Sequence, residues 1–191
     1  MAPPKPSSPA SPASHAPASH AARGLRLCIA LLALGMVGCD HATKIAAEAK
    51  LSGAQALPIV SGILELRYTR NDDTAFSLLH TFGLQRSPGL LLAMASLALV
   101  AIAVMWVASR KKASKVQHVA FALVIAGALG NVLDRALRGY VVDFIHLSRW
   151  PVFNVADIAV VAGMLLLFAS GLKSKAPTPP APLPPDPPAP G

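Results

Sequence analysis

The stretch that decides the fold is residues 87–109, which read SPGLLLAMASLALVAIAVMWVAS. This stretch carries no charged side chain. A helix needs about 20 predominantly apolar residues to cross the hydrocarbon core of a bilayer. Residues 87–109 are long enough for one crossing, and the chain is therefore predicted to be an integral membrane protein.

The composition of the whole chain also indicates a membrane protein. Of its 191 residues, 53% are hydrophobic and 14% are charged, and the mean hydropathy is +0.52. Soluble domains carry about 25% charged residues. The net charge of +8 does not indicate nucleic-acid binding, because the cations cluster beside apolar segments and form no basic face with interleaved aromatic residues.

Four apolar segments are predicted to cross the membrane, and short clusters of cations flank them. Cytoplasmic loops carry an excess of Lys and Arg, which places both termini and the loop at 110–115 in the cytoplasm. The segments at 48–87 and 134–154 then face the outside (periplasm). The predicted spans are Leu25 to about Ala47, about Pro88 to Ser109, Val116 to Leu133, and about Val155 to Leu172.

The chain divides into a membrane domain at residues 23–173 and two tails. Residues 1–22 are rich in Pro, Ser and Ala, and residues 174–191 are rich in Pro, so both tails are predicted to be disordered or polyproline-like. Residues 58–70 combine β-branched and aromatic residues with partial alternation. This pattern predicts short strands at the membrane surface.

Four acids fall at the predicted outer ends of the helices: Asp40, Asp134, Asp143 and Asp157. Ionisable groups near membrane helices are candidates for functional sites. Asp40 lies four residues before Lys44, and Asp134 precedes Arg135 and Arg138, so structural ion pairs are favoured for these two acids.

Asp143 in VVDFI and Asp157 in VADIA have no such neighbours in sequence. A carboxyl group among apolar residues tends to have a raised pKa, and two such groups can share one proton, as in aspartic proteases. Asp143 could instead be a turn or strand-end acid bonded to backbone amides. Asp157 could be part of a helix cap with Asn154, and such a cap is compatible with catalysis.

The first segment has an alternative interpretation. Arg23 and Arg26, an apolar run and then Met36-Val37-Gly38-Cys39 look like a lipoprotein signal peptide with its lipid-modified cysteine. This alternative predicts a lipid-anchored protein modified at Cys39.

Five motifs follow one another along the chain. They are Asp40-x-x-Thr43-Lys44, Asn71 with Ala75-Phe76-Ser77, Gly127-Ala128-Leu129-Gly130-Asn131-x-x-Asp134-Arg135, Gly139-x-Val141-Val142-Asp143-Phe144, and Phe153-Asn154-x-Ala156-Asp157. Taken together, they resemble the lipoprotein signal peptidase (signal peptidase II) family over about residues 25–172. Since the first motif includes Asp40, the resemblance favours reading Cys39 as a helix residue.

The resemblance implies an all-α membrane fold of four transmembrane helices with a small extracytoplasmic β-cradle. It implies that Asp143 and Asp157 are the catalytic pair. Residues that hold the substrate backbone or support the pair would be Asn71, Asn131, Arg135, Asn154, Asp134, Asp40 and Lys44. The outer loop departs from the family pattern, because Asp73 and Thr74 stand where the family usually has Gly and Ala.

The implied reaction is hydrolysis just before a diacylglyceryl-modified cysteine, at the outer face of the bacterial inner membrane. One aspartate, ionised, would take a proton from water, and the other would protonate the scissile carbonyl. We expect no metal or organic cofactor, a monomer, and prolipoproteins and membrane lipids as partners. A small transporter or channel is the other alternative, although it would place its acids near the bilayer midplane.

Overall fold

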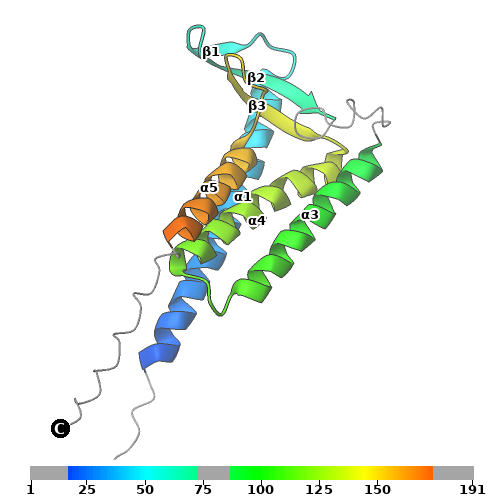
Figure 1. The fold of residues 1–191 in the computed structure, drawn as a ribbon. Coiled ribbons are helices and arrows are strands. Elements are labelled where there is room, and N and C mark those ends of the chain that lie inside the picture. The colour runs from blue at the N-terminus through cyan, green and yellow to red at the C-terminus, as the bar shows by residue number, and fades with distance from the viewer. Residues whose placement is uncertain (1–16, 73–86, 174–191) are drawn as a thin grey trace, which may run out of the picture.

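The computed structural model describes residues 17–72 and 87–173, with side chains from residue 23 onward. Helices form a bundle, and a small sheet covers one end of it (Figure 1). The predictions for residues 1–16, 73–86 and 174–191, including those for Asp73, Thr74 and Ala75-Phe76-Ser77, lie outside the described residues. The elements are α1 (Pro17–Leu51), β1 (Leu57–Val60), β2 (Leu64–Asn71), α3 (Pro88–Ser109), α4 (Lys115–Arg138), β3 (Val141–Leu147) and α5 (Val155–Lys173).

Helix α3 covers the predicted second span, and α4 and α5 contain the third and fourth. Helix α1 differs, because it begins at Pro17 and continues to Leu51. Residues 17–22, which were assigned to the disordered tail, are therefore helical in the structure. Alanine is the best helix former, and the local sequence PASHAA allows the first turns to extend outward from the span. At its other end, α1 reaches the sheet (Figure 1).

In the part of the chain that the structure describes, three helices are long and apolar enough to cross a membrane: α1 from Arg23, α3 and α4. The apolar part of α5 is shorter, at Val155–Gly171. Spans of about 17 residues lie at the lower limit for a crossing. Large apolar side chains such as Leu97, Val104 and Phe168 face outward from the helices. This surface suits a lipid environment, and the fold is mostly helical with membrane-spanning helices as predicted.

Helix α4 lies at the centre, and α1, α3 and α5 all pack on it. Its contact with α5 is close because glycine removes the side chain at two crossing points. Gly127 lies against the Ala156 carbonyl and Val160, and Gly163 of α5 lies against Ala120 and Val124. A methyl group at either glycine would collide with backbone. Small residues serve the same purpose in other membrane helix pairs.

The ends of α4 are determined by local sequence. Ser114 and Gln117 form a reciprocal capping box at its start. Gly139 ends it in the left-handed conformation, with φ of 81°, which a residue with a side chain rarely adopts. This turn sends the chain directly into β3, so that β3 begins beside the end of α4.

The sheet has the order β1-β2-β3, and both pairs are antiparallel. Strands β1 and β2 confirm the strands predicted at 58–70. Strand β3 was not predicted as a strand, because Asp143 interrupts its apolar run. Residues 141–144 are buried on both faces, and β2 covers one edge of β3. A strand buried on both faces shows no alternation of polar and apolar residues, and this explains why the sequence pattern did not reveal it.

Candidate active site

Asp143 lies in β3 and is almost completely buried, with 2% exposure. Its strand is paired with β2 so that Thr69 lies opposite Asp143 and Asn71 lies opposite Val141. Side chains on diagonal positions of neighbouring strands can reach one another. The Asn71 amide donates a 2.8 Å hydrogen bond to Asp143 Oδ2 in this way.

Asp157 lies in the first turn of α5 and forms a reciprocal cap with Asn154. The Asn154 backbone N–H donates to Asp157 Oδ2 at 3.1 Å, and the Asp157 backbone N–H donates to Asn154 Oδ1 at 3.0 Å. The predicted cap is therefore confirmed. An acid in the first turn also interacts favourably with the positive end of the helix dipole. The cap fixes the direction of the Asp157 carboxylate.

Asn154 joins the two acids. It is fully buried, and its side-chain amide donates a 2.6 Å hydrogen bond to Asp143 Oδ1. It reaches β3 because Phe153 pairs with Ile145 through backbone hydrogen bonds in both directions. One residue thus contacts the carboxyl groups of both Asp143 and Asp157, and the predicted pair lies together in the fold.

Asn131 of α4 supports the pair from the opposite side. Its amide nitrogen donates to Asp157 Oδ1 at 2.8 Å. Its oxygen accepts hydrogen bonds from Asn154 Nδ2 at 3.2 Å and from Lys44 Nζ at 3.0 Å. Because both ends of the amide are used, its orientation is set by the residues around it.

Asp40, Lys44 and Asp134 form a buried charged cluster behind Asn131. Lys44 Nζ lies 2.7 Å from Asp40 Oδ2 and 3.0 Å from Asp134 Oδ2, and the three residues are at most 2% exposed. The acids also accept backbone hydrogen bonds from α5 and β3: Ala156 donates to Asp40 at 2.9 Å, and Val142 donates to Asp134 at 3.3 Å. The cluster therefore ties α1 and α4 to the two elements that carry Asp157 and Asp143.

The local ion-pair predictions were confirmed only in part. Asp40 pairs with Lys44 as expected, and Asp134 lies 3.8 Å from Arg138 Nε. The closer cation for Asp134 is Lys44, which lies on another helix and was not predicted as its partner. Gly130 makes room for this arrangement, because a methyl group there would come within 2.6 Å of Asp40 Oδ2.

Arg135 lies one helical turn after Asn131, on the same face of α4. Its guanidinium interacts electrostatically with both Asp143 and Asp157. Asp143 and Asp157 have no cation close to them in the sequence. The positive charges that act on them come instead from other elements, namely Arg135 of α4 and Lys44 of α1.

The pKa of Asp143 is raised to about 6, chiefly by burial and to a smaller extent by the negative charge of Asp157. Hydrogen bonds from Asn71 and Asn154 act in the opposite direction, since they stabilise the carboxylate. Burial has the larger effect. Near neutral pH, Asp143 can therefore exchange a proton, which is the property that a general acid requires.

Sequence reasoning missed a polar cluster that joins α1 to the sheet. Tyr68 and Tyr140 both donate to Glu48 Oε1 at 3.2 Å, and Arg138 Nη1 lies 3.1 Å from Glu48 Oε2. Arg70 donates to the Tyr140 hydroxyl at 3.0 Å and stacks 4.3 Å from the centre of its ring. The alternation of Tyr68 and Arg70 on one face of β2 was the available signal.

Within the residues that the structure describes, no group of three or more His, Cys, Asp or Glu is placed to hold a metal ion. Cys28 and Cys39 are both exposed residues of α1. Cys39 therefore occupies a helix position, as the resemblance favoured.

Comparison with known proteins identifies the family. The family profile described as Signal peptidase (SPase) II matches residues 32–173, which include every motif described above. The chain belongs to the signal peptidase II family. The "Lipoprotein signal peptidase" of Geobacter sulfurreducens is 32% identical over 149 residues, covering 74% of this chain and 89% of that protein. The protein of the same name from Geobacter metallireducens is 36% identical over 132 residues, covering 67% and 80%.

Solved structures agree with this assignment. A bacterial membrane enzyme at 28% sequence identity superposes with a TM-score of 0.64 and covers 77% of this chain and 88% of its own. A second bacterial membrane enzyme, at 26% identity, has a TM-score of 0.66 and covers 78% and 94%. This signal peptidase II family member is thus a bacterial membrane protein, and the alternatives of a channel or a protein lipidated at Cys39 are not favoured.

Proposed function

We propose that this protein is an aspartic endopeptidase that removes signal peptides from lipid-modified prolipoproteins, with Asp143 and Asp157 as its catalytic pair. The observation that carries the proposal is the contact of Asn154 with both carboxyl groups. Two carboxyl groups positioned by one residue, in a partly buried site, are the minimal apparatus for peptide hydrolysis by shared-proton chemistry.

The environments of the two acids suggest their roles. Asp143 is the more buried, and its pKa of about 6 favours the protonated form needed to donate to the scissile carbonyl oxygen. Asp157 is half-buried, accepts two N–H hydrogen bonds and lies at a helix N-terminus, so it serves as the ionised base. It takes a proton from water while the hydroxyl oxygen bonds to the carbonyl carbon. The C–N bond then breaks as Asp157 passes its proton to the leaving nitrogen, and Asp143 regains a proton from the hydroxyl group as the carbonyl re-forms.

Arg135 and Asn71 have roles beside the pair. Arg135 supplies positive charge close to both carboxyl groups, which favours the state in which one of them is ionised. Asn71 holds Asp143 through its amide nitrogen. Asn131 and Asn154 orient Asp157, while Asp40, Lys44 and Asp134 position Asn131 and the backbones of β3 and α5.

The position of the site also suits a lipid-modified substrate. The acids lie where β3 and α5 meet, at the end of a bundle whose outer surface is apolar (Figure 1). The acyl chains of a substrate could stay in the bilayer while its peptide bond reaches the pair. A channel would instead require acids near the middle of the spans.

Purified protein should cleave a prolipoprotein peptide whose cysteine carries a diacylglyceryl group, and the new N-terminus should be that cysteine. The same peptide without lipid should be cut at least ~100-fold more slowly, because remote binding energy normally contributes to catalysis. Mass spectrometry of the products measures both reactions. Equal cleavage of the two peptides would contradict the proposed substrate class, and cleavage of neither would contradict the proposed activity.

We also propose that both termini and the loop after α3 lie in the cytoplasm, with the sheet and the acids outside. Arg110, Lys111, Lys112 and Lys115 flank the end of the bundle away from the sheet, which is the distribution expected for a cytoplasmic face. Reporter fusions after Lys112 and Lys175 should report the cytoplasm, and a fusion after Gln55 should report the outside. An external signal at Lys175 would contradict an even number of crossings.

A further inference from the structure

A cavity of about 790 Å³ is lined by residues near the start of α1, the end of α3 and the start of α4. These helix ends lie away from the sheet (Figure 1), whereas Asp143 lies in the sheet and Asp157 in the first turn of α5. The cavity exists because α1 and α3 each pack on α4 but, within residues 17–72 and 87–173, not on one another. A groove remains between α1 and α3, with α4 as its floor. Ligand sites in proteins commonly have volumes of roughly 300–1,000 Å³.

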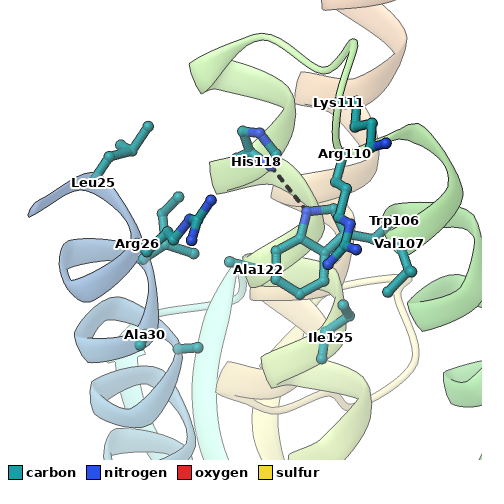
Figure 2. Close-up of a pocket in the computed structure, with 12 residues that line it drawn as sticks. Leu25, Arg26, Ala30, Trp106, Val107, Arg110, Lys111, His118, Ala122 and Ile125 are labelled. Carbon is teal, nitrogen blue, oxygen red and sulfur yellow. Dashed lines mark hydrogen bonds between the residues drawn. The ribbon is translucent and has the colours of Figure 1, made fainter. Parts of the chain in front are cut away.

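The walls of the cavity are apolar and its rim is cationic. Arg26 comes from α1 on one side, and Arg110 and Lys111 come from the turn that follows α3 on the other (Figure 2). None of the lining residues is acidic. Within the described residues, none of these three cations forms an ion pair with an acid. The apolar lining consists of Leu25, Ile29, Ala33, Val107, Ala122 and Ile125, among others.

One wall of the cavity is held in place by a polar contact. The Trp106 indole N–H donates a 3.0 Å hydrogen bond to His118 Nδ1, and the two rings meet edge to face (Figure 2). This contact joins α3 to α4 beside the rim. Tryptophan is enriched at the headgroup level of membranes, so the rim lies at the depth where lipid phosphates are found.

We propose that this cavity binds one anionic glycerophospholipid, with its phosphate among Arg26, Arg110 and Lys111 and an acyl chain between α1 and α3. A phospholipid is the molecule at a membrane surface that combines an apolar chain with a negative headgroup, and juxtamembrane cations attract such headgroups. The signal peptide of a substrate fits poorly, because its N-terminal region is positively charged. The site is separate from the proposed catalytic pair.

The proposal is tested with the purified full-length chain, delipidated in neutral detergent and titrated with phosphatidylglycerol. Native mass spectrometry should detect one retained molecule of phosphatidylglycerol. Phosphatidylcholine should bind at least about tenfold more weakly. Glycerophosphoglycerol, which is the same headgroup without acyl chains, should not compete. Competition by the headgroup alone, or equal binding of the two lipids, would overturn the proposal.

A charge-matched pair of variants separates this site from general surface charge. The first triple variant removes the three cations of the rim and carries Arg26→Gln, Arg110→Gln and Lys111→Gln. It should weaken phosphatidylglycerol binding by about tenfold or more. The control is Arg23→Gln with Lys112→Gln and Lys115→Gln, which removes three exposed cations that do not line the cavity. The control should change binding less than about threefold. Equal weakening by both variants would show diffuse electrostatic attraction and overturn the assignment.

A second variant keeps the charge and fills the groove. Ala30 lines the cavity from α1 (Figure 2), whereas Leu34 is 70% exposed and does not line it. Ala30→Phe should reduce phosphatidylglycerol retention, and Leu34→Phe should not. Unchanged phosphatidylglycerol retention in Ala30→Phe would overturn the proposal. A photocrosslinker placed at position 30 should react with bound lipid, and a crosslink to a signal peptide in its place would also overturn the proposal.

Discussion

Asp143→Asn and Asp157→Asn are each expected to lower cleavage of a lipidated precursor by at least about 10³-fold while leaving the protein folded. General acid–base groups commonly contribute 10²–10⁴-fold, and residues that act as one unit lose nearly the full effect when either is changed. An amide has nearly the same shape as a carboxyl group but neither ionises near neutral pH nor accepts a proton from water. The measurement is single-turnover cleavage, with thermal unfolding followed in parallel.

The control for the pair is Glu65→Gln, because Glu65 is an acid of the same sheet that pairs with His146 away from Asp143. This variant should keep activity within about threefold, since Glu65 is partly exposed and contacts neither acid of the pair. Asp134→Asn should lose stability more than chemistry, because Asp134 contacts Lys44 and Val142 and not the pair. Full activity in Asp143→Asn, beside a stable and inactive Asp134→Asn, would reverse the assignment.

The raised pKa of Asp143 adds a dependence on pH. The activity should fall on the alkaline side as Asp143 loses its proton near pH 6 in the free enzyme. A carboxyl group whose pKa is raised from 3.8 to about 6 by folding stabilises the protein fully below pH 3.8. That stabilisation is lost as the pH rises through about 6. Asp143→Asn should remove this component of the pH dependence of thermal unfolding.

Lys44→Met is expected to destabilise the protein by about 3–5 kcal/mol, because it leaves Asp40 and Asp134 buried without the cation that lies between them. Lys44 is completely buried, so water cannot replace its ammonium group. The expected result is a large fall in the unfolding temperature and poor recovery of folded protein from the membrane. The matched control is Lys50→Met, since Lys50 is an exposed lysine in the last turn of the same helix.

A neutral version of the cluster tests the cause. Asp40→Asn with Lys44→Met and Asp134→Asn removes all three charges, while asparagine oxygens can still accept from the Ala156 and Val142 backbones. This triple variant should be more stable than Lys44→Met alone, because replacing a whole buried ion cluster is far less costly than removing one partner. If Lys44→Met proved as stable as Lys50→Met, the cluster would have no structural role.

The local features of the chain could be predicted from its sequence because they depend on neighbouring residues. Residues 88–109 form the predicted span, since hydrophobic length alone decides whether a helix can cross a bilayer. Asp40 and Lys44 meet because they are four apart on one helix. Asn154 caps Asp157 because their spacing matches the first turn of a helix.

The choice of Asp143 and Asp157 as the catalytic pair, in place of Asp40 and Asp134, did not follow from neighbouring residues in the sequence. Residue patterns alone favoured ion pairs for Asp40 and Asp134 but left plain structural roles open for Asp143 and Asp157. The resemblance to a family named the pair, and the geometry now supports that choice. The contacts that matter join residues far apart in the chain, namely Asn71 with Asp143 and Lys44 with Asp134.

The sequence by itself therefore determined the membrane spans, the helix caps and the i, i+4 ion pair of this protein, since each is decided within a few turns of chain. Only the tertiary structure decided that β3 is a strand, that Lys44 serves two acids, and that a cavity remains between α1 and α3. The physical reason is that the register of β2 on β3 and the close packing of α4 on α5 bring distant polar groups together. Burial then makes their pairing obligatory, because an unpaired buried charge is too costly to keep.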